Sequence, residues 1–140
     1  MNLILKLLLK TPVIVYNCGG GWIFGKRFIL LKHVGRVSKR IRKTPLEVIG
    51  ERDGNPIVIS GFGMGSDWVL NIQNSPNVSI AWGKKSLDCC AMGISKSKRK
   101  KILEEYRSRN PMLIPIYEKW MGRSWGEFEN FPMYVFEVIG

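Results

Sequence analysis

The chain has 140 residues, of which 45% are hydrophobic and 24% are charged. One domain of this length can bury about 68–70% of the surface that its unfolded chain exposes, so we expect a single domain over residues 1–140. This composition disfavours a disordered, collagen-like or multi-span membrane protein. The unusual feature is the net charge of +11, with 22 Lys and Arg against 11 Asp and Glu. Such a charge favours association with nucleic acid, anionic lipid or a polyanionic cofactor.

The first predicted element is an amphipathic helix over residues 1–16. Asn2, Lys6 and Lys10 recur at i, i+4 and i+8, so they form one polar stripe and leave a broad apolar face. The uncharged runs are far shorter than the roughly 20 residues of a bilayer span. The helix therefore either covers its own domain or lies on a membrane surface with its lysines at the headgroups.

The next elements form a predicted β-meander. The apolar run at 28–34 predicts a buried strand, and a further strand is predicted over 43–50. Asp53-Gly54 is a hairpin turn signal that leads into a strand over 56–60.

The connection between the first two strands is strongly basic. The window 26–43 contains no Asp or Glu, and its cations are Lys26, Arg27, Lys32, Arg36, Lys39, Arg40, Arg42 and Lys43. No salt bridge within this window can neutralise them, so the predicted partner is an anion. The guanidinium groups of Arg36 and Arg42 could hold a phosphate bidentately.

A glycine-rich segment follows the meander. Gly-Phe-Gly-Met-Gly at 61–65 precedes Ser66-Asp67, which we expect to cap a short helix that runs through Ile72. Free backbone amides beside a helix N-terminus favour anionic groups, so this segment is a second candidate phosphate contact. The alternative is a solvated hairpin tip next to a tight glycine turn.

The second half of the chain adds a hairpin, two helices and a last strand. Strands are predicted over 78–82 and 86–94, helices over 96–109 and 111–121, and a strand over 133–139. Five or six antiparallel strands with helices at the joints predict an α+β fold, a small barrel with helical insertions. The helix over 96–109 is basic, which a solvated surface explains better than nucleic-acid binding.

The cysteines and the histidine do not suggest a metal centre. Cys18, Cys89 and Cys90 are odd in number and are expected to be reduced thiols of a cytoplasmic protein. His33 lies among apolar strand residues without a partner at metal-ligand spacing, so we interpret it as a hydrogen-bonded core histidine.

Several segments together resemble the deazaflavin-dependent nitroreductase family. They keep the order and spacing of that family from Leu9 onward, and they are 28–36 (Phe-Ile-Leu-Leu-Lys-His-Val-Gly-Arg), 42–47 (Arg-Lys-Thr-Pro-Leu-Glu), 58–63 (Val-Ile-Ser-Gly-Phe-Gly), Ser66-Asp67-Trp68 with Asn71, and 74–78 (Asn-Ser-Pro-Asn-Val). The resemblance implies a split β-barrel of the FMN-binding type. It also implies an oxidoreductase that passes hydride from reduced coenzyme F420 to a quinone, enone or nitro compound.

The resemblance also implies which residues bind the coenzyme. Those matching the segment that grips its phosphate and acidic tail are Arg36, Ser38, Lys39 and Arg42. Those on the following strand, where the family's backbone passes the deazaflavin ring, are Thr44, Pro45 and Leu46. The residues that match the loop bordering the ring and phosphate are Ser60, Gly61, Phe62 and Gly63. Trp68 matches the tryptophan that opens the short helix.

The catalytic proton has one candidate donor in the protein. Some family members carry a tyrosine cluster in the late helical segment, where this chain has only Tyr117. Tyr117 is therefore the candidate catalytic residue, with bulk water as the alternative proton source.

Two other functions stay open at this point. The same barrel could bind FMN or another flavin-like ligand, or the +11 charge could serve a non-catalytic module for anionic membrane or nucleic acid. A homodimer, and a peripheral membrane contact through residues 1–16, are both compatible with the sequence.

Overall fold

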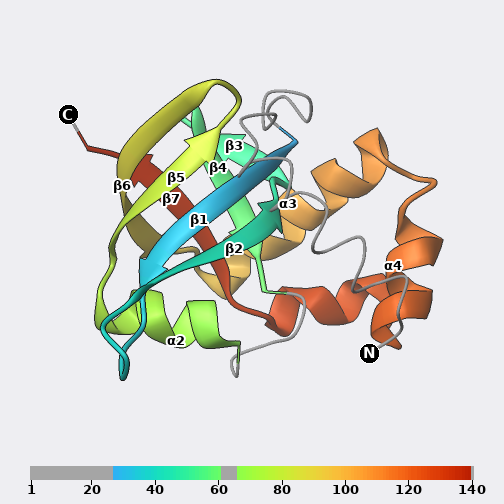
Figure 1. The fold of residues 1–140 in the computed structure, drawn as a ribbon. Coiled ribbons are helices and arrows are strands. Elements are labelled where there is room, and N and C mark those ends of the chain that lie inside the picture. Colours follow the sequence, from blue (N-terminus) through green and yellow to red (C-terminus); the bar gives the residue numbers. More distant parts are fainter. Residues whose placement is uncertain (1–26, 61–65, 140) are drawn as a thin grey trace.

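Seven antiparallel strands form one curled sheet in the computed structural model, which describes residues 27–60 and 66–139 (Figure 1). The strands are β1 (Phe28–Val34), β2 (Ile41–Glu47), β3 (Gly50–Arg52), β4 (Asn55–Ile59), β5 (Asn77–Trp82), β6 (Lys85–Gly93) and β7 (Met133–Val138). Their order in the sheet is β2-β1-β5-β6-β7-β4-β3. β2 and β3 are therefore the edge strands, and the curl brings β2 close to β4.

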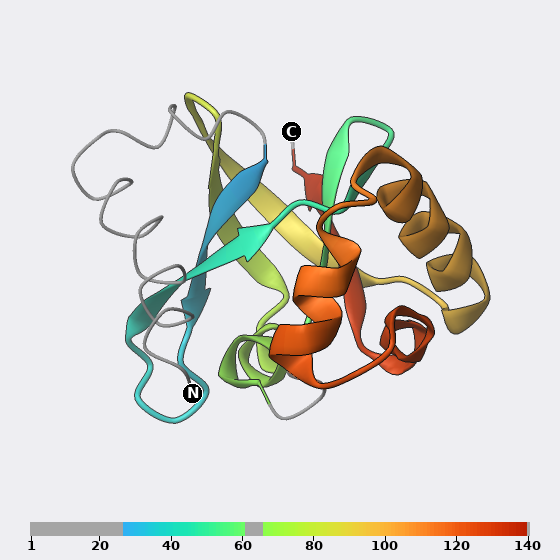
Figure 2. The same ribbon diagram turned by 90° about the vertical axis from the view of Figure 1, so that its right-hand side faces the viewer.

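The helices divide into two groups around this sheet. They are α2 (Asp67–Asn74), α3 (Lys96–Arg109), α4 (Ile114–Met121) and the 3-10 helix η3 (Trp125–Asn130). Figures 1 and 2 show α2 beside the β1–β2 hairpin, while α3, α4 and η3 gather on the other side of the sheet. No described helix is long and apolar enough to cross a bilayer.

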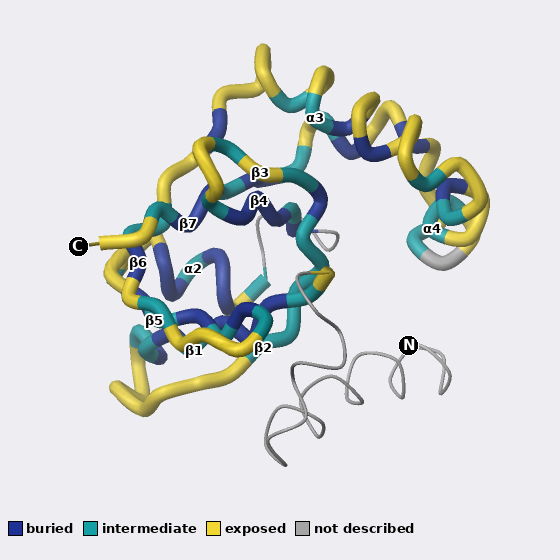
Figure 3. The backbone as a smooth tube through the Cα atoms, turned by 90° about the horizontal axis from the view of Figure 1, so that it is seen from above, coloured by how far each residue is buried: buried dark blue, intermediate teal, exposed yellow. Residues whose placement is uncertain are grey.

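Each group of helices covers its own hydrophobic cluster. The first cluster joins β1 and β5 to α2 and includes Ile29, Leu31, Ile80, Val69 and Ile72. The second joins β4 and β7 to α3, α4 and η3, and includes Ile57, Val135, Leu103, Trp125 and Phe128. Figure 3 shows much of β4, β7 and α2 as buried and the tip of the β1–β2 hairpin as exposed. Each fully buried large side chain contributes about 1.5–3 kcal/mol, so the two clusters hold the hairpin and the helices in fixed relation.

The strand predicted over 43–50 is wrong in its bounds. β2 begins at Ile41 and ends at Glu47, and the chain then turns into β3. Val48 N donates to Arg27 O at 2.8 Å, whereas Ile49 N donates to Ile57 O at 2.8 Å. The pairing partner therefore changes from the β1 side to β4 between two consecutive residues, which makes a corner that strand propensity does not report.

Other predictions agree more closely with the structure. The strand over 28–34 and the helix over 96–109 are β1 and α3 with the predicted bounds. The late helix begins at Ile114 instead of 111, with a proline in its first turn. The prediction missed η3 although its capping box, Ser124 with Glu127, is visible in the sequence. The predicted helix over 1–16 lies outside the described residues.

Candidate functional site

The β1–β2 hairpin places several cations at one end of edge strand β2. Lys39 N donates to Gly35 O at 2.9 Å and Gly35 N donates to Arg40 O at 2.8 Å, which closes the turn. Lys39 has a φ of 62°, in the left-handed region. A Cβ atom on Gly35 would lie 2.4 Å from Ser38 Oγ, so a larger residue there would require the Ser38 hydroxyl to move.

Arg36 is fixed to helix α2. Its backbone N and its guanidinium both donate to Asn71 Oδ1 at 3.0 Å. The guanidinium also lies 3.4 Å from an Asp67 carboxylate oxygen, although the Asp67 side chain is 85% exposed and the ion pair is correspondingly weak. The basic window contains no acid, and Arg36 finds its carboxylate on another element, helix α2.

Asn71 extends this contact into the core through His33. The Asn71 amide Oδ1 accepts from Arg36, so its Nδ2 donates to His33 Nδ1 at 3.0 Å. His33 Nε2 then carries the proton and donates to Thr44 Oγ1 at 2.9 Å. His33 and Asn71 are each 3% exposed, which confirms His33 as a hydrogen-bonded core histidine. The chain of contacts links α2, β1 and β2 and sets the position of the hairpin.

The histidine should make the stability of the protein depend on pH. Burial, with the nearby Arg42 charge, lowers the pKa of His33 from its ordinary value of 6.5. The unfolded chain therefore binds more protons just below pH 6.5, and the free energy of unfolding should fall as pH drops through this interval. Urea unfolding at a series of pH values measures this slope. His33→Gln should flatten it, and an unchanged slope in that variant would assign the effect to other groups.

Three further hairpin cations form no ion pair with an acid of the described residues. Lys39, Arg40 and Arg42 are exposed, and none of them forms an ion pair with a carboxylate in residues 27–60 or 66–139. Guanidinium and ammonium groups bind phosphate and carboxylate through charge-assisted hydrogen bonds. This donor set fits the phosphate and acidic tail of coenzyme F420.

Three other predicted coenzyme contacts lie on β2, the second strand of this hairpin. The Thr44 hydroxyl is hydrogen-bonded to His33. Leu46 packs against the first cluster on the inner side of β2. Pro45 is half-buried on the same strand, where an edge position tolerates a residue without an N–H.

The glycine-rich segment 61–65 lies outside the described residues, and the residues that flank it are described. Ser60 is buried and its hydroxyl lies 3.0 Å from Ser66 Oγ. Trp68 is buried in the first cluster, with its ring edge-on to Tyr134 at 5.9 Å between centroids. Gly61, Phe62 and Gly63 lie outside the described residues, so their contact with the coenzyme stays a prediction.

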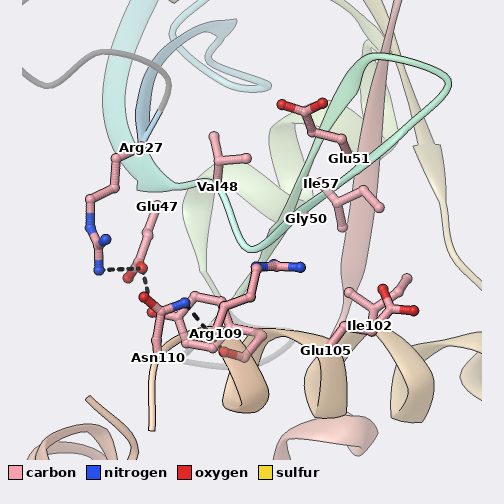
Figure 4. A pocket seen from close by; sticks show the side chains of 11 residues that line it. Arg27, Glu47, Val48, Gly50, Glu51, Ile57, Ile102, Glu105, Arg109 and Asn110 are labelled. Atoms are coloured by element: carbon pink, nitrogen blue, oxygen red, sulfur yellow. Dashed lines mark hydrogen bonds and ion pairs between the residues drawn. The ribbon is translucent and has the colours of Figure 1, made fainter. Parts of the chain in front are cut away.

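Tyr117 belongs to a separate cluster at the other end of β2. Its hydroxyl and that of Tyr106 each donate to a different oxygen of the Glu47 carboxylate. Arg27 lies 3.6 Å from the same carboxylate. Burial raises the pKa of Glu47, and burial together with this carboxylate raises the pKa of Tyr106. Figure 4 shows Glu47 at the wall of a cavity of about 540 Å³ between β2, β3 and α3.

Sequence reasoning assigned no site role to Asn71 or Glu47. For Asn71 a signal existed, since Asp67 and Asn71 are spaced i, i+4 and so lie on one face of α2. Glu47 had no such signal, because its partners lie 59 and 70 residues away on α3 and α4.

The curled sheet with its helices is a split β-barrel, as comparison with solved structures shows. The structure of the F420-H2 dependent reductase FDR-A superposes with a TM-score of 0.58 at 21% identity, covering 81% of this chain and 96% of that chain. A domain-swapped dimer gives 0.59 at 21% identity, over 91% and 94%. The heme storage protein HutZ from Vibrio cholerae gives 0.60 at 11% identity, over 90% and 91%. Comparison with curated proteins gave no match.

The sequence comparison with protein families is more specific. Residues 13–137 match the F420H(2)-dependent quinone reductase family, and the chain belongs to that family. It is therefore an oxidoreductase whose cofactor is coenzyme F420, which decides against FMN and against a non-catalytic basic module. The predicted resemblance, the split barrel and the cofactor are confirmed.

Proposed function

We propose that this protein uses reduced coenzyme F420 to reduce a small electron-poor acceptor, with a quinone as the preferred class and enones or nitro compounds as alternatives. The observation that carries the proposal is the cluster of Lys39, Arg40 and Arg42, which has no ion-pairing carboxylate among the described residues. The family match supports a quinone as acceptor.

The chain's own residues supply binding, position and a proton. Arg42, Lys39 and Ser38 would hold the phosphate and acidic tail, while Arg36 keeps the hairpin against α2. The backbone and side chains of residues 44–46 would border the ring. The bound coenzyme supplies the hydride, and the protein's task is to orient it in a site with limited water. The Tyr117 hydroxyl is the proposed proton donor.

An anaerobic assay tests this function. Reduced coenzyme F420 is mixed with the protein and a panel of a quinone, an enone and a nitroaromatic compound, and coenzyme oxidation is followed by absorbance. We expect protein-dependent oxidation with the quinone. Failure of every acceptor class to speed oxidation of the reduced coenzyme would reject the proposal.

We further propose a cytoplasmic location and a homodimer. Cys89 and Cys90 are free thiols, and burial raises the pKa of Cys89 to about 11, so it stays protonated and unreactive. These thiols support a reducing compartment. The domain-swapped dimer among the structural neighbours supports self-association, which sedimentation velocity would measure. A membrane contact through residues 1–16 rests on their sequence alone.

A further inference from the structure

We propose that Glu47 holds the proton that Tyr117 delivers to the reduced acceptor, and that the cavity between β2, β3 and α3 connects Glu47 to water. This inference rests on the proposed function, because it assumes that Tyr117 faces the acceptor. Glu47 acts through Tyr117, so it is a positioning and proton-holding residue.

The contacts of Glu47 suit this role. Its side chain is 14% exposed, and each carboxyl oxygen is paired with one phenol. In the carboxylate form both phenols donate to it, whereas in the acid form the Glu47 O–H would donate to Tyr117 and leave the Tyr117 hydrogen for the acceptor. The two phenols differ in access, since Tyr106 is 2% exposed whereas Tyr117 is half-buried on α4. Glu47 thus joins a fully enclosed phenol to one that can reach a ligand. Figure 4 shows its carboxylate pointing from the end of β2 toward α3, with Arg27 on one side.

The position of Glu47 along β2 agrees with the expected direction of the coenzyme. Arg42 and Glu47 lie on the same strand, five residues apart, which corresponds to about 17 Å. If the hairpin holds the anionic tail, the residues at 44–46 border the ring, and Glu47 follows directly after them. Because side chains alternate along a strand, Glu47 and Arg42 point to opposite faces of β2, so Tyr117 on α4, and not Glu47 itself, would meet the acceptor at this end.

Several charged groups lie around the cavity that Glu47 lines. Arg27, which precedes β1, is 3.6 Å from the Glu47 carboxylate and favours its ionised form. Arg109 and Glu105 on α3 and Glu51 on β3 line the same cavity. The hydrogen bonds from Tyr106 and Tyr117 favour the carboxylate. Burial is the largest effect and raises the pKa of Glu47 above its ordinary 4.5.

The proton moves to the acceptor in two transfers. Hydride addition to a quinone brings two electrons and leaves one oxyanion. The Tyr117 O–H bond breaks as the acceptor O–H bond forms, and the acid proton of Glu47 passes to the Tyr117 phenolate. Water in the cavity then returns a proton to the Glu47 carboxylate. For each hydride one proton passes through Glu47 and Tyr117 to the acceptor, and both residues are restored.

The test combines a titration without coenzyme and a rate measurement. In the coenzyme-free protein, infrared spectroscopy should show a carboxylic acid C=O band that titrates above pH 4.5. Glu47→Gln should remove this band, whereas Glu104→Gln, an exposed acid on α3, should keep it. With coenzyme and quinone, the kcat of the wild type should fall as pH rises and Glu47 loses its proton. Glu47→Gln should lower kcat at least about tenfold and remove this pH dependence. Its affinity for the coenzyme should be unchanged.

Tyr117→Phe provides a second route if Glu47→Gln does not fold. It should lose the same pH-dependent fall of kcat and keep the Glu47 infrared band, because Tyr106 still holds the carboxyl group. A wild-type protein that turns over while both variants keep its pH profile and kcat would overturn the role of Glu47 alone. Absence of turnover in the wild type with every acceptor would overturn the proposed function, and this inference with it.

Discussion

Arg42→Ala is expected to weaken binding of coenzyme F420 by about 1.5–3 kcal/mol, or roughly 10- to 150-fold in the dissociation constant. Arg42 is exposed on β2 and has no ion-pairing carboxylate among the described residues, so its guanidinium is available to an anionic ligand. Loss of a charge-assisted hydrogen bond to the phosphate or tail accounts for the expected change. Isothermal titration with the oxidised coenzyme measures it.

The control for Arg42→Ala is Arg107→Ala. Arg107 is an exposed arginine on α3, far along the chain from the hairpin, and its removal lowers the net charge by the same amount. We expect this variant to bind the coenzyme with nearly wild-type affinity. Equal weakening in both variants would mean that only the overall charge matters, and unchanged affinity in a folded Arg42→Ala protein would remove Arg42 from the site.

Asn71→Leu is expected to lower the free energy of unfolding by about 2–4 kcal/mol. The substitution removes the acceptor of two Arg36 hydrogen bonds and the donor to His33, while keeping a side chain of similar size. His33 Nδ1 would then remain buried without a partner, which is the costly part of the change. Chemical denaturation of the purified protein gives the value.

Two further variants test whether the loss of stability comes from the buried hydrogen bonds of Asn71 or from replacing any asparagine of α2. Asn74→Leu alters an exposed asparagine of the same helix and should change stability little. Asn71→Asp keeps the oxygen that accepts from Arg36, but it forces His33 to carry its proton on Nδ1 instead of Nε2. We expect Asn71→Asp to raise the pKa of His33, as histidine NMR titration would show. An Asn71→Leu protein as stable as the wild type would contradict the network as an anchor for the hairpin.

The sequence predicted elements best where periodicity and end signals coincide. β1 is a mainly apolar run, interrupted only by Lys32 and His33 and followed by a glycine, and α3 follows a serine at its N-cap position. The prediction failed at the corner between β2 and β3, where the backbone changes pairing partner. Local propensity is similar on both sides of such a corner, so only the assembled sheet reveals it.

The candidate site was predictable in composition but not in pairing. The run of cations identified the hairpin, because a window without acids must find its anion elsewhere. The sequence did not show that Arg36 already binds another residue of the protein, because its partner Asn71 lies 35 residues away. Glu47 was hidden more fully, because its role depends on how α3 and α4 pack against the end of β2.

The central claim is that the hairpin cations bind the anionic end of the coenzyme. Isothermal titration of the wild-type protein with coenzyme F420, and with a deazaflavin riboside that lacks the phosphate and acidic tail, tests it most directly. We predict that the complete coenzyme binds at least about tenfold more tightly, and that added salt narrows this difference. Equal affinity for the two compounds at low salt would contradict the claim.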